Sequence, residues 1–175
     1  QRKLEKKYKQ INKNFFFVNS GFNLRPTDIQ AAIGLSQFKS LNDFIKVRKI
    51  NRYRIIKKIT LDKRWKNQVS FLEKSKNVQP SWFGLTMLLN RKFKNKKNLI
   101  FSKLNKFGIE NRPIISGNFL KQPALIKYKI RQKSSDFPNA NYVHEYGFFV
   151  GLKNKLMNSV EINKFINIFF KSFNV

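Results

Sequence analysis

Five polar residues on predicted loops carry the side chains that phosphate or sugar recognition needs: Asn23, Arg25, Arg112, Ser116 and Asn118. Arginine offers a planar fork of N–H donors, and asparagine offers amide donors and one acceptor. Binding residues concentrate on loops that a rigid scaffold positions. Together with the composition and spacing of the whole chain, these residues indicate a soluble, basic α+β piece with loops suited to an anionic or hydroxyl-rich ligand.

Other common kinds of chemistry have few residues to support them. The sequence has no Cys and one His, His144, so it offers no thiolate, and a zinc site would need some of the nine carboxylates. No glycines fall in the spacing of a phosphate-binding loop. His144 lies near nothing that resembles a nucleophile elbow, so we expect it to be a packing or surface residue. We predict no catalytic residue and no metal site in this chain.

The loop that contains Asn23 and Arg25 runs into a predicted helix within Asn19–Leu35. Thr27 or Asp28 can accept a hydrogen bond from the free N–H groups at the start of that helix. A loop that ends on a helix N-terminus favours an anion. An ordinary loop before a tightly packed helix explains the same residues, so both interpretations stay open from the pattern alone.

A formal net charge of +28 is the most unusual feature of the composition. A polyanionic partner would explain it, and so would drift toward Lys, Asn, Ile and Phe, which are abundant together. Lysine is spread along the chain, so we expect only non-specific contact with nucleic acid. No apolar run is long enough to span a bilayer, so we expect no membrane insertion. Residue 1 is Gln, which suggests a cut or internal start, and no signal peptide is visible.

The pattern of apolar residues and turn residues predicts alternating helices and strands around one layer. Gly108 is expected to end a helix, and Pro113 argues against a central, fully paired strand. We expect helices at 27–59, 95–107, 136–145 and 158–173, with a re-start or kink near 40–43, and strands at 15–18, 69–72, 81–89, 109–115 and 147–151.

One stretch resembles a family signature. Residues 21–38 read GFNLRPTDIQAAIGLSQF, similar to the G-[YF]-N-x-R-x-T-[DE]-x-Q-A-A-x-G-L-x-Q-L signature of the DegT/StrS family of sugar aminotransferases. Residues 41–48 resemble the L-x-x-F-I-x-x-R continuation of that signature. The family consists of pyridoxal-phosphate enzymes of fold type I.

Three later stretches resemble one branch of that family. Residues 80–85 read PSWFGL, residues 108–119 read GIENRPIISGNF and residues 147–151 read GFFVG. They are similar to P-S-W-F-G-F, G-I-E-T-R-P-I-x-A-G-N and G-F-F-V-G of the 3-dehydratase branch. That branch acts on nucleotide-linked 4-keto-6-deoxyhexoses in lipopolysaccharide and O-antigen synthesis.

The resemblance implies specific roles for the five polar residues. Asn23 matches the family residue that reaches the cofactor phosphate of the partner subunit, and Arg25 faces the same region. Arg112, Ser116 and Asn118 match the branch motif and are expected to line the sugar-nucleotide pocket. An ion pair within the small domain would explain Arg112 equally well.

The resemblance also implies what this chain lacks. The active-site Lys of the family, replaced by His in the 3-dehydratases, is expected in a large domain that precedes this sequence. We therefore expect a fragment of a cytoplasmic, homodimeric enzyme that uses pyridoxal 5'-phosphate or pyridoxamine 5'-phosphate on a nucleotide sugar. Residues 1–26 would end the large domain, 27–59 would form a long interdomain helix, and 60–175 would form a mixed α/β small domain. Dehydratase and aminotransferase both stay open, and a basic nucleic-acid-binding module is the alternative function.

Overall fold

The structure is a computed structural model that describes residues 6–9, 11, 15–19, 21, 27–128 and 132–175. The chain forms two compact units. Unit 1 combines Gln1–Leu24 with Pro113–Gly147, and unit 2 combines Arg25–Arg112 with Phe148–Val175.

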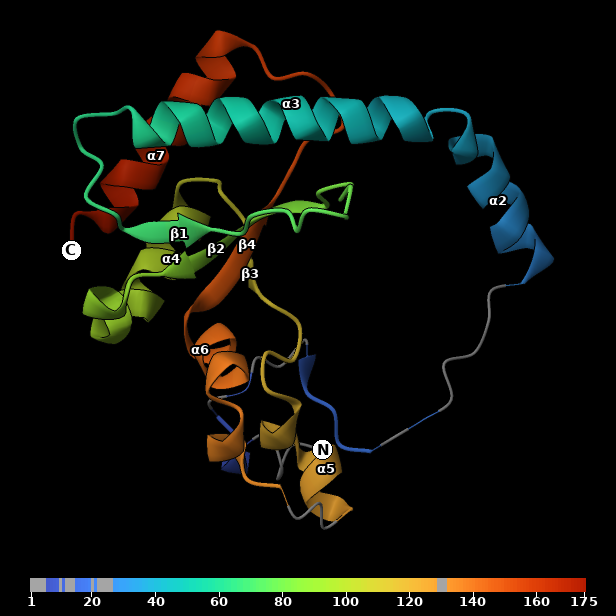
Figure 1. Cartoon of the computed structure of the whole chain (residues 1–175), viewed down its shortest axis with the longest axis vertical. Helices are drawn as coiled ribbons and strands as arrows, with labels where there is room; N and C mark the ends of the chain where they lie inside the picture. Colours follow the sequence, from blue (N-terminus) through green and yellow to red (C-terminus); the bar gives the residue numbers. More distant parts are fainter. Residues whose placement is uncertain (1–5, 10, 12–14, 20, 22–26, 129–131) are drawn as a thin grey trace. The chain divides into compact units, whose positions relative to one another are not determined.

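Unit 2 contains the long helices and almost all of the sheet (Figure 1). The sheet has the strand order β1-β2-β4-β3, with β1 and β2 antiparallel and Val69 opposite Leu89. Its described elements are α2 (Asp28–Phe38), α3 (Leu41–Thr60), β1 (Val69–Phe71), β2 (Gly84–Leu89), η2 (Arg91–Lys96), α4 (Lys97–Lys106), β3 (Asn111–Pro113), β4 (Gly147–Gly151) and α7 (Ser159–Phe173). The last residue of β3, Pro113, and the first residue of β4, Gly147, belong to unit 1.

The core of unit 2 lies where α3, α4 and α7 meet the sheet. Helix α7 packs against both α3 and α4, and its residues Ile162, Ile166 and Phe169 are buried. They recur at the three- and four-residue spacing that places side chains on one helix face. Asn158 and Glu161 cap the helix reciprocally, with 2.9 Å hydrogen bonds from Glu161 N to Asn158 Oδ1 and from Asn158 N to Glu161 Oε2. The final helix predicted at 158–173 is thus confirmed.

The helix predicted over 27–59 appears as two helices, α2 and α3, separated by Lys39 and Ser40. Helix α2 begins after Thr27, whose N–H donates to Gln30 Oε1 at 2.8 Å. Its apolar residues Ile29, Ile33 and Phe38 are all exposed, and α2 has no buried residue. Helix α3, in contrast, buries Asn51, Ile55 and Ile59.

The strands follow the sequence pattern except that β3 is shorter than the strand predicted at 109–115 and that residues 15–18 form no strand. Strand β3 has only three residues and lies at the sheet edge, as expected for a segment that contains Pro113, since proline donates no ladder hydrogen bond. Gly108 has a φ of 89° and follows α4 as the predicted terminating glycine. The strand predicted at 15–18 is wrong, because those residues form no strand.

Unit 1 contains short helices around a loop. Its described elements are η3 (Phe119–Lys121), α5 (Pro123–Lys127), η4 (Ser134–Asp136) and α6 (Pro138–Tyr146). The side chain of Gln122, which is 1% exposed, accepts from Phe17 N at 3.1 Å and donates to Phe15 O at 3.0 Å. A side-chain amide thus pairs with a backbone that a neighbouring strand would otherwise satisfy.

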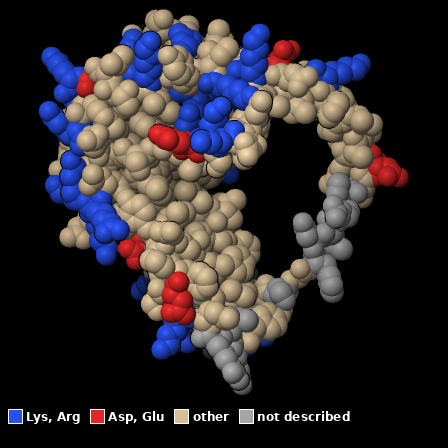
Figure 2. All heavy atoms as spheres, viewed as in Figure 1, with Lys and Arg blue, Asp and Glu red and all other residues tan. Residues whose placement is uncertain are grey.

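Lys and Arg side chains are spread over the face of the molecule shown in Figure 2, with few Asp or Glu between them. The charge is therefore not confined to one element of the visible surface. Among the described residues, no helix is long and apolar enough to cross a membrane.

Candidate functional site

The three later motif stretches meet at one cavity in unit 2, which we call the motif cavity. Its volume is about 390 Å³, within the range of small-molecule sites. Phe83 comes from the first stretch, Glu110 and Arg112 come from the second, and Phe149 comes from the third. The second and third stretches also supply Gly108, Ile109, Val150 and Gly151. The remaining lining residues are Ile55 of α3, Phe165 of α7 and, between β4 and α7, Leu152, Lys153 and Met157.

Close approach of β2 to β4 brings the first and third stretches together. A Cβ atom on Gly84 would lie 2.7 Å from Phe149 Cδ2 and 2.9 Å from the backbone oxygen of Val150. The neighbouring Phe83 ring lies 5.9 Å from the Phe149 ring, and Leu152 N–H donates to Phe83 O at 3.4 Å. A glycine at this position therefore allows the two aromatic rings to sit together at the cavity.

Arg112 lies on the edge strand β3 and lines the motif cavity. Its Nε donates to Glu110 Oε1 at 2.8 Å, and Nη2 lies 2.7 Å from the same oxygen. The ion-pair alternative for Arg112 is thus observed. Both side chains are more than half exposed, so this pair contributes little to stability. A guanidinium held loosely by an exposed carboxylate can exchange that partner for an anionic ligand.

Trp82, in the first motif stretch, has a φ of 50°, which is unusual for a bulky residue. The Arg52 guanidinium of α3 lies over its ring at 3.8 Å, and Arg52 Nη2 donates to the backbone oxygen of Leu72. Arg52 Nε is buried without a hydrogen-bond partner among the described residues. Burial lowers the pKa of Arg52, and the carboxylate of Glu73 acts in the opposite direction. This stacking holds Trp82, the residue before Phe83, and Phe83 lines the motif cavity.

Asn51 supports the wall of the motif cavity that Lys153 and Met157 form. The sequence did not predict this residue as part of the site. This residue of α3 is fully buried. Its Nδ2 donates to Lys153 O at 3.2 Å and to Lys155 O at 2.9 Å, while Oδ1 accepts from Met157 N at 3.0 Å. An amide in a helix face that is otherwise apolar was the available signal, because a buried polar group needs partners.

Ser116 and Asn118 lie in unit 1, whereas Arg112 lies in unit 2. Ser116 has a φ of 63°, and the following Gly117 has a φ of 39°. A Cβ atom on Gly117 would lie 2.4 Å from His144 Cα, so the loop passes directly against α6. Glycine is required there both for its conformation and for its small size.

Asn118 is 2% exposed, and its side chain is fully engaged in hydrogen bonds. Nδ2 donates to Ser134 Oγ at 3.0 Å and to Asn141 Oδ1 at 2.9 Å, and Oδ1 accepts from Leu120 N at 3.0 Å. Its backbone N–H lies 3.5 Å from His144 Nδ1. These contacts tie the Ser116 loop to η4 and α6.

The two residues expected at the cofactor phosphate, Asn23 and Arg25, lie outside the described residues. Helix α2 begins at Asp28, three positions after Arg25 in the sequence. An amide and a guanidinium next to a helix N-terminus are donors that suit a phosphate. Among the described residues, no group of three or more His, Cys, Asp or Glu could hold a metal ion.

Comparison with known proteins identifies relatives of this chain. It is 34% identical over 142 residues to the GDP-4-keto-6-deoxy-D-mannose 3-dehydratase of Escherichia coli O55:H7, a match that covers 81% of this chain and 35% of the relative. It is 30% identical over 165 residues to the enzyme of the same name from Yersinia pseudotuberculosis, covering 94% of this chain and 40% of the relative.

A solved structure of the E. coli GDP-4-keto-6-deoxy-D-mannose-3-dehydratase with bound hydrated PLP matches the fold. The TM-score is 0.65 at 30% identity, over 91% of this chain and 39% of that one. The mixed helix-and-sheet fold expected from the sequence thus matches part of a fold type I enzyme. The chain spans between 35% and 40% of the length of these three relatives.

The family model described as the DegT/DnrJ/EryC1/StrS aminotransferase family matches residues 2–167. That range contains all four motif stretches on which the resemblance depends, so the predicted family is confirmed. This chain belongs to the DegT/DnrJ/EryC1/StrS aminotransferase family.

Proposed function

We propose that this chain is the C-terminal part of a PLP- or PMP-dependent enzyme that removes the C3 hydroxyl of a GDP-linked 4-keto-6-deoxyhexose. Such a reaction belongs to lipopolysaccharide or O-antigen synthesis. The carrying observation is the 34% identity to a GDP-4-keto-6-deoxy-D-mannose 3-dehydratase. Aminotransfer is the second candidate, because the matching family model is that of aminotransferases.

The geometry that supports this proposal is the motif cavity. Residues far apart in the sequence, Phe83, Arg112 and Phe149, line the same space. All three belong to stretches that resemble the 3-dehydratase branch. Aromatic rings offer faces for a sugar or a base, and a guanidinium offers donors to a diphosphate. The cavity thus combines apolar walls with the cations Arg112 and Lys153, as expected for part of a nucleotide-sugar site.

Arg112 and Ser116 are the candidate substrate contacts. Arg112 would exchange its exposed partner Glu110 for a negatively charged oxygen of the ligand. Ser116 would present its hydroxyl from a loop of fixed conformation. For Asn118 we propose a positioning role, because its buried amide is already used to hold that loop.

Asn23 and Arg25 would hold the phosphate of the cofactor, with Asn23 reaching the site of a partner subunit in a homodimer. When bound, the cofactor supplies an electron sink for chemistry next to a carbonyl. Residues 1–26 would then close a large domain, and 60–175 would form the small domain. The active-site base would lie outside this chain, so the 175 residues alone should turn over no keto-sugar.

A titration of the 175-residue chain with GDP-mannose, followed by two-dimensional NMR, tests the substrate half of this proposal. We expect weak, saturable binding that shifts the amide signals of residues 83, 108–112 and 149–153. An Arg112→Gln variant should weaken binding by about tenfold, since a charge-assisted hydrogen bond contributes roughly 1.5 kcal/mol or more. Arg91→Gln, which alters a cation that does not line the motif cavity, is the matched control.

Equal weakening in the two variants would show that only the general positive charge attracts the nucleotide. Saturable binding without shifts around the motif cavity would place the ligand elsewhere. Either result would overturn the assignment of the motif cavity to the substrate.

A further inference from the structure

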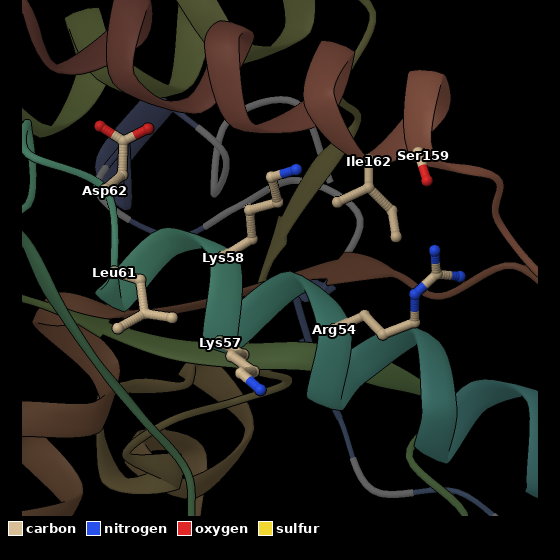
Figure 3. A pocket seen from close by; sticks show the side chains of 7 residues that line it. All are labelled: Arg54, Lys57, Lys58, Leu61, Asp62, Ser159 and Ile162. Atoms are coloured by element: carbon tan, nitrogen blue, oxygen red, sulfur yellow. The ribbon is translucent and has the colours of Figure 1, made fainter.

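A second hollow in unit 2 lies between α3 and the first turns of α7, and we call it the α3–α7 hollow (Figure 3). Its volume is about 460 Å³, again within the range of small-molecule sites. It shares no lining residue with the motif cavity. The lining consists of Arg54, Lys57, Lys58, Leu61, Asp62, Ser159 and Ile162.

The lining is strongly positive. Three of its seven residues are cations, and Asp62 is the only carboxylate among them. Asp62 is already paired with Arg64, which contacts both carboxylate oxygens at 2.7 and 2.8 Å. Hydrogen bonds from Arg64 lower the pKa of Asp62 to about 2. The negative charge of Asp62 is therefore neutralised by Arg64, which does not line the hollow. The three cations that do line the hollow can attract an anion.

Two of these cations face α7. Figure 3 shows the Arg54 guanidinium near Ser159 and the Lys58 amino group extended toward α7, while Lys57 points away from both. Arg54 Nη1 donates to Met157 O, which holds the guanidinium in place, and its other N–H groups bond to no described residue. The Lys58 amino group makes no hydrogen bond or ion pair to any described residue. Two cations and the Ser159 hydroxyl thus converge on one space.

This donor set fits phosphate better than carboxylate. Arginine binds two oxygens through its planar fork, lysine supplies a point charge, and a hydroxyl supplies one further donor. A phosphate group offers at least three oxygens in different directions, whereas a carboxylate offers two in one plane. Leu61 and Ile162 add apolar surface beside the cations.

We propose that the α3–α7 hollow binds a small organic phosphate, with Arg54, Lys58 and Ser159 on the phosphate group and Leu61 and Ile162 against the apolar part. This site is separate from the motif cavity and does not depend on the enzymatic function proposed above. The competing explanation is that the lysines of the hollow only reflect the general excess of lysine in the composition. In that case, replacing a lysine inside the hollow and replacing one outside it would weaken phosphate binding equally.

Phenyl phosphate is a suitable probe because it carries one phosphate and one apolar ring. We would titrate it into the 175-residue chain at about 150 mM salt, where long-range attraction between exposed charges is screened. Two-dimensional NMR should show saturable shifts of Ser159, Ile162 and Lys58. Inorganic phosphate should bind the same residues several-fold more weakly, because it lacks the ring.

Lys58→Gln should raise the Kd for phenyl phosphate by about tenfold, corresponding to the loss of one charge-assisted contact. The matched control is Lys46→Gln, an exposed lysine on the same helix that does not line the hollow. Lys46→Gln should change the Kd by less than about twofold. Lys58→Glu, which places a negative charge in the hollow, should abolish binding. Both positions are at the surface, so thermal unfolding should confirm intact folds.

Three results would overturn the proposal. One is the absence of saturable shifts with wild-type protein up to tens of millimolar probe. Another is equal weakening by Lys58→Gln and Lys46→Gln, which would leave only general charge attraction. The third is equal affinity for phenyl phosphate and inorganic phosphate, which would exclude a contact with Leu61 and Ile162.

Discussion

Asn51 Oδ1 accepts a hydrogen bond from Met157 N at 3.0 Å, linking two residues that are 106 positions apart. The same amide donates to the backbone oxygens of Lys153 and Lys155. One buried side chain of α3 therefore fixes the segment between β4 and α7, which supplies Lys153 and Met157 to the motif cavity. Helix α3 thus acts as the support of this wall.

Replacing Asn51 with Leu should lower the free energy of unfolding by about 2–4 kcal/mol, because it leaves the buried N–H of Met157 without an acceptor and removes two further hydrogen bonds. Chemical denaturation measures this change. Asn42→Leu, at an exposed position of the same helix, should change the free energy by less than about 0.5 kcal/mol. Similar values for the two variants would contradict a structural role for the Asn51 amide.

Gly84→Ala should destabilise the chain by roughly 1–3 kcal/mol, because the added Cβ would press on a backbone oxygen that cannot rotate away. Gly34→Ala is the matched control. It lies in α2 with nothing within 4 Å of the added Cβ, so better helix propensity should stabilise the helix by up to about 1 kcal/mol. The midpoint temperature of thermal unfolding should fall for Gly84→Ala and rise for Gly34→Ala. An unchanged stability of Gly84→Ala would show that β2 and β4 leave room for the added Cβ atom.

Local sequence signals predicted the elements whose ends are set by nearby residues. Asn158, a residue type that caps helices, stands at the start of the helix predicted at 158–173, and Gly108 marked the end of α4. Pro113 restricted β3 to a short edge strand. These signals operate over a few residues, which is why a single sequence reveals them.

Long-range partners could not be predicted in the same way. Residues 15–17 look like a strand, but their backbone pairs with the side chain of Gln122, 105 positions from Phe17. The clamp made by Asn51 and the stacking of Arg52 on Trp82 also join distant segments. For the candidate site, the motif resemblance predicted Arg112, Ser116 and Asn118 as residues of interest. Nothing local distinguished the exposed Arg112 from the buried Asn118.

Arg52→Ala should loosen the segment that precedes β2, because it removes the stacking on Trp82 and the hydrogen bond to Leu72 O. We expect faster amide hydrogen exchange in residues 72–83, by about tenfold, if these contacts contribute more than about 1 kcal/mol together. Residues of α4, which make neither of these contacts, should exchange at the wild-type rate. Unchanged exchange in residues 72–83 would show that Trp82 is held by other contacts.

Asp62 predicts an acid-sensitive contribution to stability. Its pKa of about 2 in the folded chain lies below the ordinary aspartate value. A carboxyl with a lowered folded-state pKa stabilises the fold above the unfolded-state pKa, and this contribution is lost as the pH falls toward 2. Wild type should therefore be more stable than Asp62→Asn at neutral pH, and the difference should shrink between about pH 4 and pH 2. A difference that stays constant over this range would contradict the Asp62–Arg64 pairing.

The central claim, that this chain supplies one part of a nucleotide-sugar 3-dehydratase site, is tested most directly with a chimera. In it, this chain replaces the matching segment of the E. coli O55:H7 relative, and mass spectrometry follows GDP-4-keto-6-deoxy-D-mannose in the presence of the cofactor. The account predicts replacement of the C3 hydroxyl of the substrate by hydrogen, a loss of one oxygen for which PMP supplies the two electrons, and this loss should be strongly reduced by Asn23→Ala or Arg112→Ala. A chimera that is soluble and cofactor-loaded but leaves the substrate unchanged would contradict it.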